Sequence, residues 1–336
     1  MQGKNSERKI TDYYDGYETK YPKLLELSNK QLEEQMWFAS EVRVEEEDRL
    51  EMLYDLTDVQ QKVVKAILPM FRKYEDNVAD FWVDVFMRYF QSAECKEGAL
   101  VFGMMERAVH ERFYDKINKV FGTDTDEHYL SYLQDPVFKE RAKWLGETLD
   151  SEDKHLVCLV FGLVEGVSLF SMFALLRSFQ ANGYNKIATT VKGTKQSAID
   201  ELLHSNYLAT AFNYLYAERG ETLSEDTYYL NKLLEQVDVV VENEKYILDQ
   251  LIGDVGGFNG VPIQEYYTLI EFLANDYLKR LGVKELPFNC KESALYSWFV
   301  STSVGYADPD FFGKGLGKEY ETAWNKSGFS NCWSEK

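Results

Sequence analysis

The chain has 336 residues and a formal net charge of −19, with 56 acidic against 37 basic side chains. Nucleic-acid phosphates and anionic membrane surfaces both attract positive charge, so we expect neither as a direct partner. Apolar residues make up 45% of the sequence and only six prolines interrupt it, which is compatible with one large core and one domain over residues 1–336.

From about Leu50 onward, apolar residues recur at helical spacing over long segments that short breaks separate. The first segment, residues 57–91, has Thr57 or Asp58 as its candidate N-cap. The second follows a break near Ser92 and ends at Gly122, a helix-stop residue. Further helices are expected over about 153–180, 186–218, 224–251 and 262–281. Strand signals are weak throughout, so the sequence predicts an all-α helical bundle.

The longest apolar stretch, Leu156–Leu176, is long enough for a membrane span to be considered. Glu165 lies near its middle, between Gly162 and Gly166. A carboxylate there would be costly in lipid, and it is equally costly in a protein core unless it is paired or bound to a metal. We therefore expect a helix buried on all sides, with a specific partner for Glu165.

The cysteines and the two ends of the chain indicate the cellular compartment. Cys95, Cys158, Cys290 and Cys332 are scattered and form no CxxC pair, which is typical of a reducing cytoplasm. The first 22 residues are polar and lack the apolar core of a signal peptide. We expect a cytoplasmic protein whose polar C-terminal stretch becomes a flexible tail from about residue 320.

One short motif suggests metal chemistry. Glu201 and His204 form an E-x-x-H pair, whose spacing puts both side chains on one face of a helix. In four-helix dimetal proteins, two such pairs and two single glutamates project inward from four helices. A pattern with two fixed positions also arises by chance, and the alternative is a surface Glu beside a half-buried His.

Other predicted helices supply partners for this motif. Glu165 and Glu75 lie among apolar residues where a solvated carboxylate is not expected, and Glu106 and His110 stand one turn apart. The alternative, buried ion pairs, would need a matching cluster of Arg or Lys that the sequence lacks. Four carboxylates and two imidazoles suit Fe or Mn. The expected metal ligands are Glu75, Glu106, His110, Glu165, Glu201 and His204.

Two stretches carry a family resemblance. VFGLVEGVSLFSMFALLRSFQANGY and QSAIDELLHSNYLATAF resemble the small subunit of class I ribonucleotide reductase, in which a single-Glu helix precedes an (R)-D-E-x-L-H motif. Here that motif reads Asp200-Glu201-Leu202-Leu203-His204, with Ile199 where the family often has Arg. The similarity extends from about Trp37 to Trp324 and includes residues 263–282.

The resemblance implies a ferritin-like bundle that binds two metal ions per chain. Iron is expected, and manganese or a mixed Mn/Fe pair is compatible with the same ligands. Glu75 stands where the family usually has Asp. Glu106 lies four residues before His110, whereas the family spacing is three and would fall on Arg107. Both spacings share a helical face, so Glu106 can reach the site through a local bulge.

The resemblance also assigns three residues to radical chemistry. Tyr114, one turn after His110, matches the radical-bearing tyrosine, and Trp37 with Asp200 matches the buried radical-transfer pair. For Tyr114 and Trp37 the alternative is ordinary core packing, since the chain has 23 tyrosines. The family's tail tyrosine is missing, because no tyrosine follows Tyr320, and Trp333 is the candidate substitute.

The function implied is that of the small subunit of a ribonucleoside-diphosphate reductase. Its dimetal site would activate oxygen, form a tyrosyl radical and pass it to the catalytic large subunit for deoxyribonucleotide synthesis. The C-terminal tail would bind that large subunit, and a homodimer is implied. The alternatives are a monooxygenase or oxidase on the same scaffold, and a ferritin-like metal-binding protein.

Overall fold

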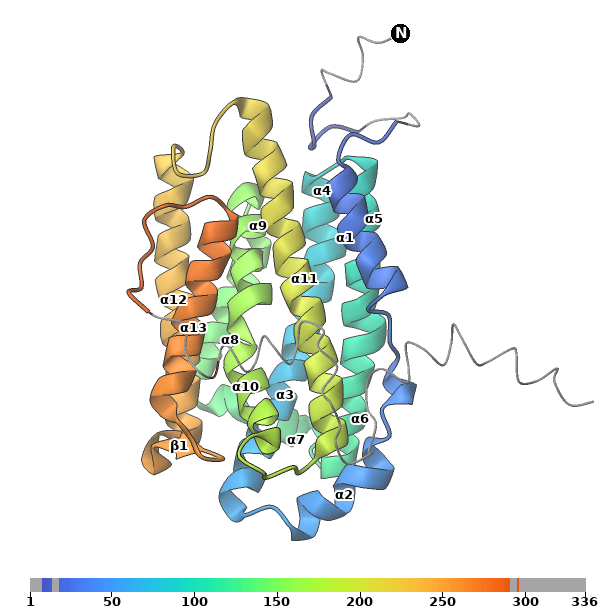
Figure 1. The fold of residues 1–336 in the computed structure, drawn as a ribbon, viewed down its shortest axis with the longest axis vertical. Coiled ribbons are helices and arrows are strands. Elements are labelled where there is room, and N and C mark those ends of the chain that lie inside the picture. The colour runs from blue at the N-terminus through green and yellow to red at the C-terminus, as the bar shows by residue number, and fades with distance from the viewer. Residues whose placement is uncertain (1–7, 14–17, 291–294, 296–336) are drawn as a thin grey trace, which may run out of the picture.

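The computed structural model describes residues 8–13, 18–290 and 295 of the chain. Long helices lie side by side along one direction. A small hairpin, made of two strands of two residues each, lies at the lower end of the described part (Figure 1). The prediction of an all-α bundle is confirmed. The tail from about residue 320, with Trp333, lies outside the described residues.

The helices fall into N-terminal, central and C-terminal groups. The N-terminal group is α1 (Pro22–Glu33), η1 (Ala39–Glu41), α2 (Val44–Tyr54), α3 (Asp58–Asp80), η2 (Phe81–Phe86) and α4 (Met87–Tyr89). The central group is α5 (Ala93–Met104), η3 (Met105–His110), α6 (Glu111–Phe121), α7 (Asp126–Tyr129), η4 (Ser131–Gln134), α8 (Pro136–Asp150), α9 (Lys154–Leu163), η5 (Val164–Ser168), α10 (Phe170–Arg177) and η6 (Ser178–Gln180). The C-terminal group is α11 (Ala188–Arg219), α12 (Thr227–Ile252), η7 (Gly253–Val255), β1 (Gly257–Phe258), β2 (Val261–Pro262) and α13 (Ile263–Arg280).

The helix ends follow the sequence signals. Thr57 is the N-cap of α3: its hydroxyl accepts a hydrogen bond from the Gln60 amide, and the Gln60 side chain accepts one from the Thr57 amide. Gly122 ends α6 with a φ of 70°, a left-handed conformation that costs glycine little. The predicted helix over 153–180 runs through α9, η5, α10 and η6.

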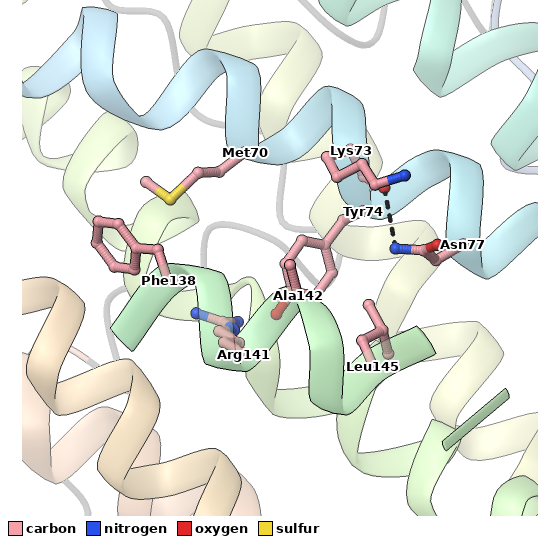
Figure 2. A pocket seen from close by; sticks show the side chains of 8 residues that line it. All are labelled: Met70, Lys73, Tyr74, Asn77, Phe138, Arg141, Ala142 and Leu145. Atoms are coloured by element: carbon pink, nitrogen blue, oxygen red, sulfur yellow. Dashed lines mark hydrogen bonds between the residues drawn. The ribbon is translucent and has the colours of Figure 1, made fainter. Parts of the chain in front are cut away.

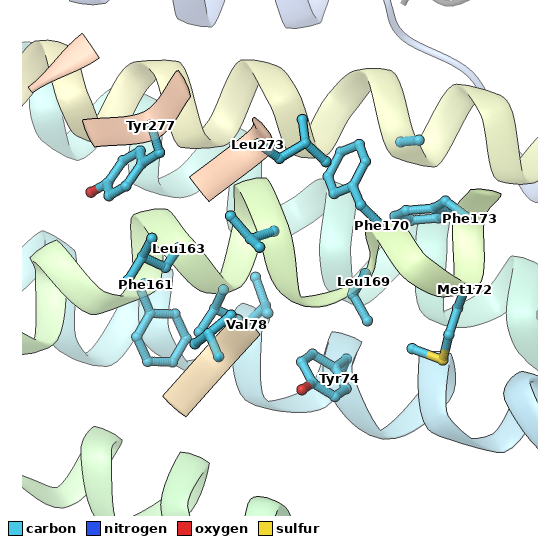
Figure 3. Packing of buried hydrophobic residues seen from close by; sticks show 14 of the residues in the cluster. Tyr74, Val78, Phe161, Leu163, Leu169, Phe170, Met172, Phe173, Leu273 and Tyr277 are labelled. Carbon is cyan, nitrogen blue, oxygen red and sulfur yellow. The ribbon is translucent and has the colours of Figure 1, made fainter. Parts of the chain in front are cut away.

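The apolar helix expected to be buried on all sides is indeed buried. Lys154–Gln180 is long and apolar enough to cross a membrane, but 94% of its most apolar window lies inside the bundle. Figure 3 shows Phe161 and Leu169 packing near Tyr74 and Val78 of α3, with Tyr277 of α13 on the other side. This packing is typical of the core helix of a bundle.

Four α-helical segments had not been predicted from apolar periodicity: α1, α2, α7 and α8. The start of α8 nevertheless has a readable signal. Pro136 occupies the first turn, where its missing N–H is not needed, and the Asp135 carboxylate accepts hydrogen bonds from the Val137 and Phe138 amides. Asp-Pro before an amphipathic stretch could therefore have located this helix.

Pro69 lies inside α3 without ending it. A proline has no N–H, so the carbonyl of Lys65, one turn earlier, loses its usual donor. His128 of α7 lies 2.9 Å from that carbonyl through Nε2. A carbonyl only accepts, so the imidazole must carry its proton on Nε2 and donate it. His128 thus has a structural role in replacing the missing backbone bond.

Three segments within the long helices are π-helical: η2, η3 and η5. A π-turn contains more residues than an α-turn, so it rotates the side chains that follow relative to those before it. Such insertions cost stability and occur most often at functional sites. Each of these three segments contributes a side chain to the centre described next.

Candidate metal centre

Six buried side chains converge in the middle of the bundle. Glu75, Glu106, His110 and Glu201 form one group, and Glu106, Glu165, Glu201 and His204 form a second that shares two members with the first. Within each group, one donor atom per residue lies within 4.8 Å of all the others. Every member is at most 1% exposed. These are the six residues expected from the sequence, and the structure brings all of them together.

Four separate parts of the chain position them: α3 carries Glu75, η3 carries Glu106 and His110, η5 carries Glu165, and α11 carries Glu201 and His204. The unusual spacing of Glu106 and His110 falls within the π-helical η3. There the Glu106 Oε2 atom lies 2.9 Å from His110 Nδ1, so both side chains face the centre. The π-turn is the local bulge that the sequence spacing required.

The donor atoms of these side chains lie close together, yet several of them form no hydrogen bond with one another. His110 Nδ1 lies 3.2 Å from Glu201 Oε1 and 3.5 Å from Glu75 Oε2. His204 Nδ1 lies 2.8 Å from Glu106 Oε1 and makes no hydrogen bond there. Several buried oxygens also lack a hydrogen-bond partner: Glu75 Oε1, Glu106 Oε1, Glu165 Oε2 and both oxygens of Glu201. Buried polar atoms without donors fit a site built for cations.

The electrostatics support the same interpretation. Burial raises the pKa of Glu75, and the Glu106 carboxylate raises it further; burial and Glu201 do the same to the pKa of Glu165. Burial lowers the pKa of His110 and His204, but the neighbouring carboxylates, Glu106 foremost, together outweigh it and raise the pKa of both. Four carboxylates in a dry site therefore need positive charge. Two divalent cations would balance them, and oxygen and imidazole donors suit Fe and Mn.

Asp200 links His110 to Trp37. One of its oxygens, Oδ2, lies 3.0 Å from His110 Nε2 and accepts a 2.8 Å hydrogen bond from the Trp37 indole. The other accepts one from the Gln31 amide at 3.0 Å. A carboxylate that already accepts from the Trp37 indole can accept from His110 too, so His110 carries a proton on Nε2 and turns Nδ1 toward the centre. A carboxylate behind a metal-binding imidazole fixes the tautomer in this way.

Tyr114 lies beside His110 and is fully buried. Its hydroxyl donates to Ser197 Oγ at 3.1 Å, and Ser197 Oγ lies 3.5 Å from His110 Nδ1. The ring stacks on Phe71 with the centroids 4.7 Å apart. Burial raises the pKa of Tyr114, and the nearby Glu75 charge adds to it. The phenol is thus protonated and dry. Ser197, which sequence reasoning missed, lies one turn before Glu201 on α11.

Trp82 is a further residue at the centre that the sequence had not singled out. Its indole nitrogen, on η2, donates to Glu165 Oε1 over 2.7 Å. Its ring meets the edge of His204 with the centroids 5.8 Å apart. An indole N–H buried in a core needs an acceptor, and here that acceptor is a ligand-type carboxylate. Nothing in the spacing around Trp82 would have identified it.

A buried ion pair contacts two of the helical segments that carry the candidate ligands. Arg141 of α8 pairs with Glu244 of α12 at 2.5 Å and donates to the Ser168 carbonyl at 3.0 Å. Its guanidinium lies 4.8 Å from the ring centroid of Tyr74. Ser168 ends η5, which carries Glu165, and Tyr74 precedes Glu75 in α3. Figure 2 shows Arg141 and Tyr74 at a small pocket between α3 and α8. Arg141 therefore contacts both η5, which carries Glu165, and α3, which carries Glu75.

The sequence of the chain is similar to that of a known protein family. The family model "Ribonucleotide reductase, small chain" matches residues 15–292. The probable ribonucleoside-diphosphate reductase small subunit 376L of Invertebrate iridescent virus 6 is 26% identical over 293 residues, covering 76% of this chain and 79% of the viral protein.

Two solved structures share the fold. The ribonucleotide reductase R2 subunit from Clostridium botulinum superposes with a TM-score of 0.73 at 18% identity, over 84% of this chain and 89% of that one. Streptococcus sanguinis dimanganese(II)-NrdF gives a TM-score of 0.70 at 18% identity, over 87% of this chain and all of the other (100%).

Proposed function

The chain belongs to the ribonucleotide reductase small-chain family, and we propose that Tyr114 carries the radical that this family's small subunit generates. The chain is the small subunit of a ribonucleoside-diphosphate reductase and works with a catalytic large subunit. This family match favours the reductase over a monooxygenase on the same scaffold, and the Trp37–Asp200–His110 connection supports that preference.

The six converging side chains would hold two metal ions. Glu75 and His110 would help to hold one ion, Glu165 and His204 the other, and Glu106 and Glu201 belong to both groups of candidate ligands. The bound metals supply the redox chemistry that activates oxygen. We assign iron to both positions. Manganese remains the alternative, and the Streptococcus sanguinis relative is described as dimanganese.

The protein's own contribution at Tyr114 is to exclude water and to hold the phenol proton. The ring is covered completely and stacked on Phe71, so solvent reductants have no direct access to it. The hydroxyl proton points at Ser197 Oγ, and that oxygen lies near His110 Nδ1. On loss of an electron from Tyr114, the phenol proton would move along this hydrogen bond to Ser197 Oγ while the hydroxyl proton of Ser197 passes on toward the centre.

The oxidising equivalent would leave through His110, Asp200 and Trp37. The hydrogen bonds of Asp200 Oδ2 join all three, and each of these side chains is at most 2% exposed. Phe38, the next residue, is 52% exposed, so this connection ends close to the surface. The large subunit would dock on this side through the C-terminal tail. We also assign a homodimer and a cytoplasmic location to the protein.

The observation that carries the proposal is the attachment of Tyr114, through Ser197 and His110, to a six-ligand centre. The test is electron paramagnetic resonance of the chain loaded with Fe(II) and exposed to oxygen, beside Tyr114→Phe. A tyrosyl doublet that disappears in the variant is expected. Two bound irons without any such signal would argue for another metal pair, to be tested with Mn(II) and mixed loading.

Activity with the large subunit tests the second half of the proposal. Trp37→Phe should keep the Tyr114 doublet, because Trp37 contacts neither the phenol nor the carboxylates of the centre. It should lose reductase turnover, because the indole N–H to Asp200 is gone. Normal turnover in Trp37→Phe would exclude this residue from the transfer path.

A further inference from the structure

His155 is the one histidine of the four whose place in the molecule is not yet explained. It is the second residue of α9 and is 4% exposed, and it lies beside Tyr216 near the C-terminal end of α11. Both of its ring nitrogens face tyrosine hydroxyls: Nδ1 lies 2.9 Å from Tyr89 Oη and Nε2 lies 3.1 Å from Tyr216 Oη.

The hydrogen bonds define one proton arrangement. Tyr216 donates its hydroxyl hydrogen to Asp226 Oδ2 over 3.2 Å, so its oxygen can only accept from His155. His155 must therefore carry its proton on Nε2, which leaves Nδ1 bare to accept from the Tyr89 hydroxyl. The result is a directed chain in which each proton points to the next acceptor, from Tyr89 through His155 and Tyr216 to Asp226.

A line of aromatic side chains joins this chain to the metal centre. Trp82, which donates to Glu165, contacts Phe86 at 5.0 Å between ring centroids. Phe86 contacts Phe90 at 4.8 Å, and Phe90 contacts Tyr89 at 4.9 Å. Trp82 and Tyr89 are seven residues apart on one continuous helix, roughly 10 Å at 1.5 Å per residue. Packed interiors at such separations permit electron transfer between oxidisable side chains.

Burial sets the protonation states that Tyr89 and His155 need in order to act as proton donor and proton acceptor. It raises the pKa of Tyr89 to about 12, so the phenol is protonated before any oxidation. Burial, with help from Arg219, lowers the pKa of His155 to about 4. An imidazole that accepts a proton from Tyr89 will therefore pass one on through Nε2 rather than remain doubly protonated.

We propose that Tyr89, with His155 as its proton acceptor, is a second oxidisable tyrosine that gives an electron toward the metal centre through Trp82 when Tyr114 does not. The inference rests on the proposed function, because the oxidant is the one generated from oxygen at that centre. Its role is protective: an oxidising equivalent that misses Tyr114 ends on a defined phenol instead of on a metal ligand.

Trp82 loses one electron to the oxidised centre and regains one from Tyr89, so Tyr89 is the species finally oxidised. The Tyr89 O–H bond breaks and its proton goes to His155 Nδ1, while the Nε2 proton goes to Tyr216 Oη and the Tyr216 hydroxyl proton to Asp226. Tyr89 is left as a neutral phenoxyl radical, and the half-buried Asp226 carboxylate is left protonated.

The experiment uses the full chain carrying Tyr114→Phe, loaded with whichever of Fe(II) and Mn(II) it binds, exposed to oxygen and freeze-quenched for electron paramagnetic resonance. A tyrosyl signal is expected that disappears when Tyr89→Phe is added. It should persist with Tyr246→Phe, a matched half-buried tyrosine that hydrogen-bonds Asp135 and lies outside the aromatic line. Adding Tyr216→Phe should leave the signal but shorten its lifetime, because the proton has nowhere further to go.

Three outcomes are possible, and each decides something. Loss of the signal with Tyr89→Phe, at unchanged metal content and thermal melting, supports the proposal. If Tyr114 forms its radical in the unmodified chain but the Tyr114→Phe signal is absent, or depends on Tyr229 instead, the proposal is overturned and the proposed function stands. If the unmodified chain forms no radical with iron, with manganese or with a mixed pair, both are overturned.

Discussion

Trp37 and Asp200 stand 163 positions apart in the chain, yet the indole nitrogen of one donates to the carboxylate of the other over 2.8 Å. The same oxygen accepts from His110 Nε2. One atom thus connects Trp37 to His110, a proposed metal ligand on η3, and it also fixes which imidazole nitrogen faces the centre. Under the proposed function, Asp200 would affect metal binding as well as radical transfer.

Replacing Asp200 with alanine should weaken metal binding although Asp200 is not itself a ligand. Without the carboxylate, His110 Nε2–H loses its acceptor and the ring loses its fixed tautomer. Loss of such a partner typically costs roughly 10- to 100-fold in metal affinity. Isothermal titration calorimetry with Mn(II) under anaerobic conditions would measure this loss of metal affinity. In Asp200→Asn the amide oxygen can still accept from His110, so this variant should retain most of the affinity; equal losses in both variants would contradict the argument.

Removing Arg141 should destabilise the fold more than removing the whole ion pair. Arg141→Met leaves Glu244 buried without its cation, a situation that typically costs about 3–5 kcal/mol. Replacing both members, as Arg141→Met with Glu244→Leu, should recover much of that loss, because two apolar side chains can fill the space. Urea unfolding at a fixed metal concentration would compare the two. If the double variant is no more stable than the single one, the loss of stability does not come from the unpaired Glu244 carboxylate.

The bond between His128 and the Lys65 carbonyl should be needed only because position 69 is proline. His128→Ala should therefore lower the free energy of unfolding by about 1 kcal/mol, the usual value of one hydrogen bond. In a Pro69→Ala background, the helix supplies its own N–H to Lys65, and His128→Ala should then have a smaller effect. A double-mutant cycle from urea unfolding measures this coupling; strict additivity would count against it.

His155 should make the protein less stable in acid. Its pKa is about 4 in the folded chain, against roughly 6.5 when unfolded, so the unfolded state binds more protons between these values. The stability that neutral His155 contributes is complete above about pH 6.5 and is lost as the pH falls through 4, by about 3 kcal/mol in all. His155→Gln can keep both tyrosine contacts without titrating. The two proteins should be of similar stability above about pH 6.5, and the unmodified chain should fall increasingly below the variant as the pH drops through this window; a difference that does not change with pH would contradict it.

The sequence contained most of what was needed to find the centre. Apolar periodicity located the long helices, and buried carboxylates on four of them had no cationic partners in the sequence, so Glu75, Glu165 and Glu201 could be identified as ligand candidates. The prediction was possible because a charge amid apolar residues requires an explanation whatever the fold. The ligands themselves remain predictions until metal binding is measured.

The residues that sequence reasoning missed are those whose role depends on tertiary contact. Trp82 has the ordinary look of a core aromatic, and only packing against η5 brings its N–H to Glu165. Arg141 lies on a helix that had not been predicted, and it acquires its role from Glu244, more than 100 positions away. Ser197 is one of many serines until α11 turns it toward Tyr114. No local pattern encodes such meetings.

The π-turn at η3 has a consequence for how relatives of this protein are recognised. Glu106 Oε2 and His110 Nδ1 lie 2.9 Å apart although one more residue separates them than in an E-x-x-H pair. An extra residue inside a helix can therefore leave both side chains facing the same centre, because the π-turn absorbs the change in spacing. A search for two E-x-x-H pairs would pass over such a chain, whereas a search for buried carboxylates that face one another would find it.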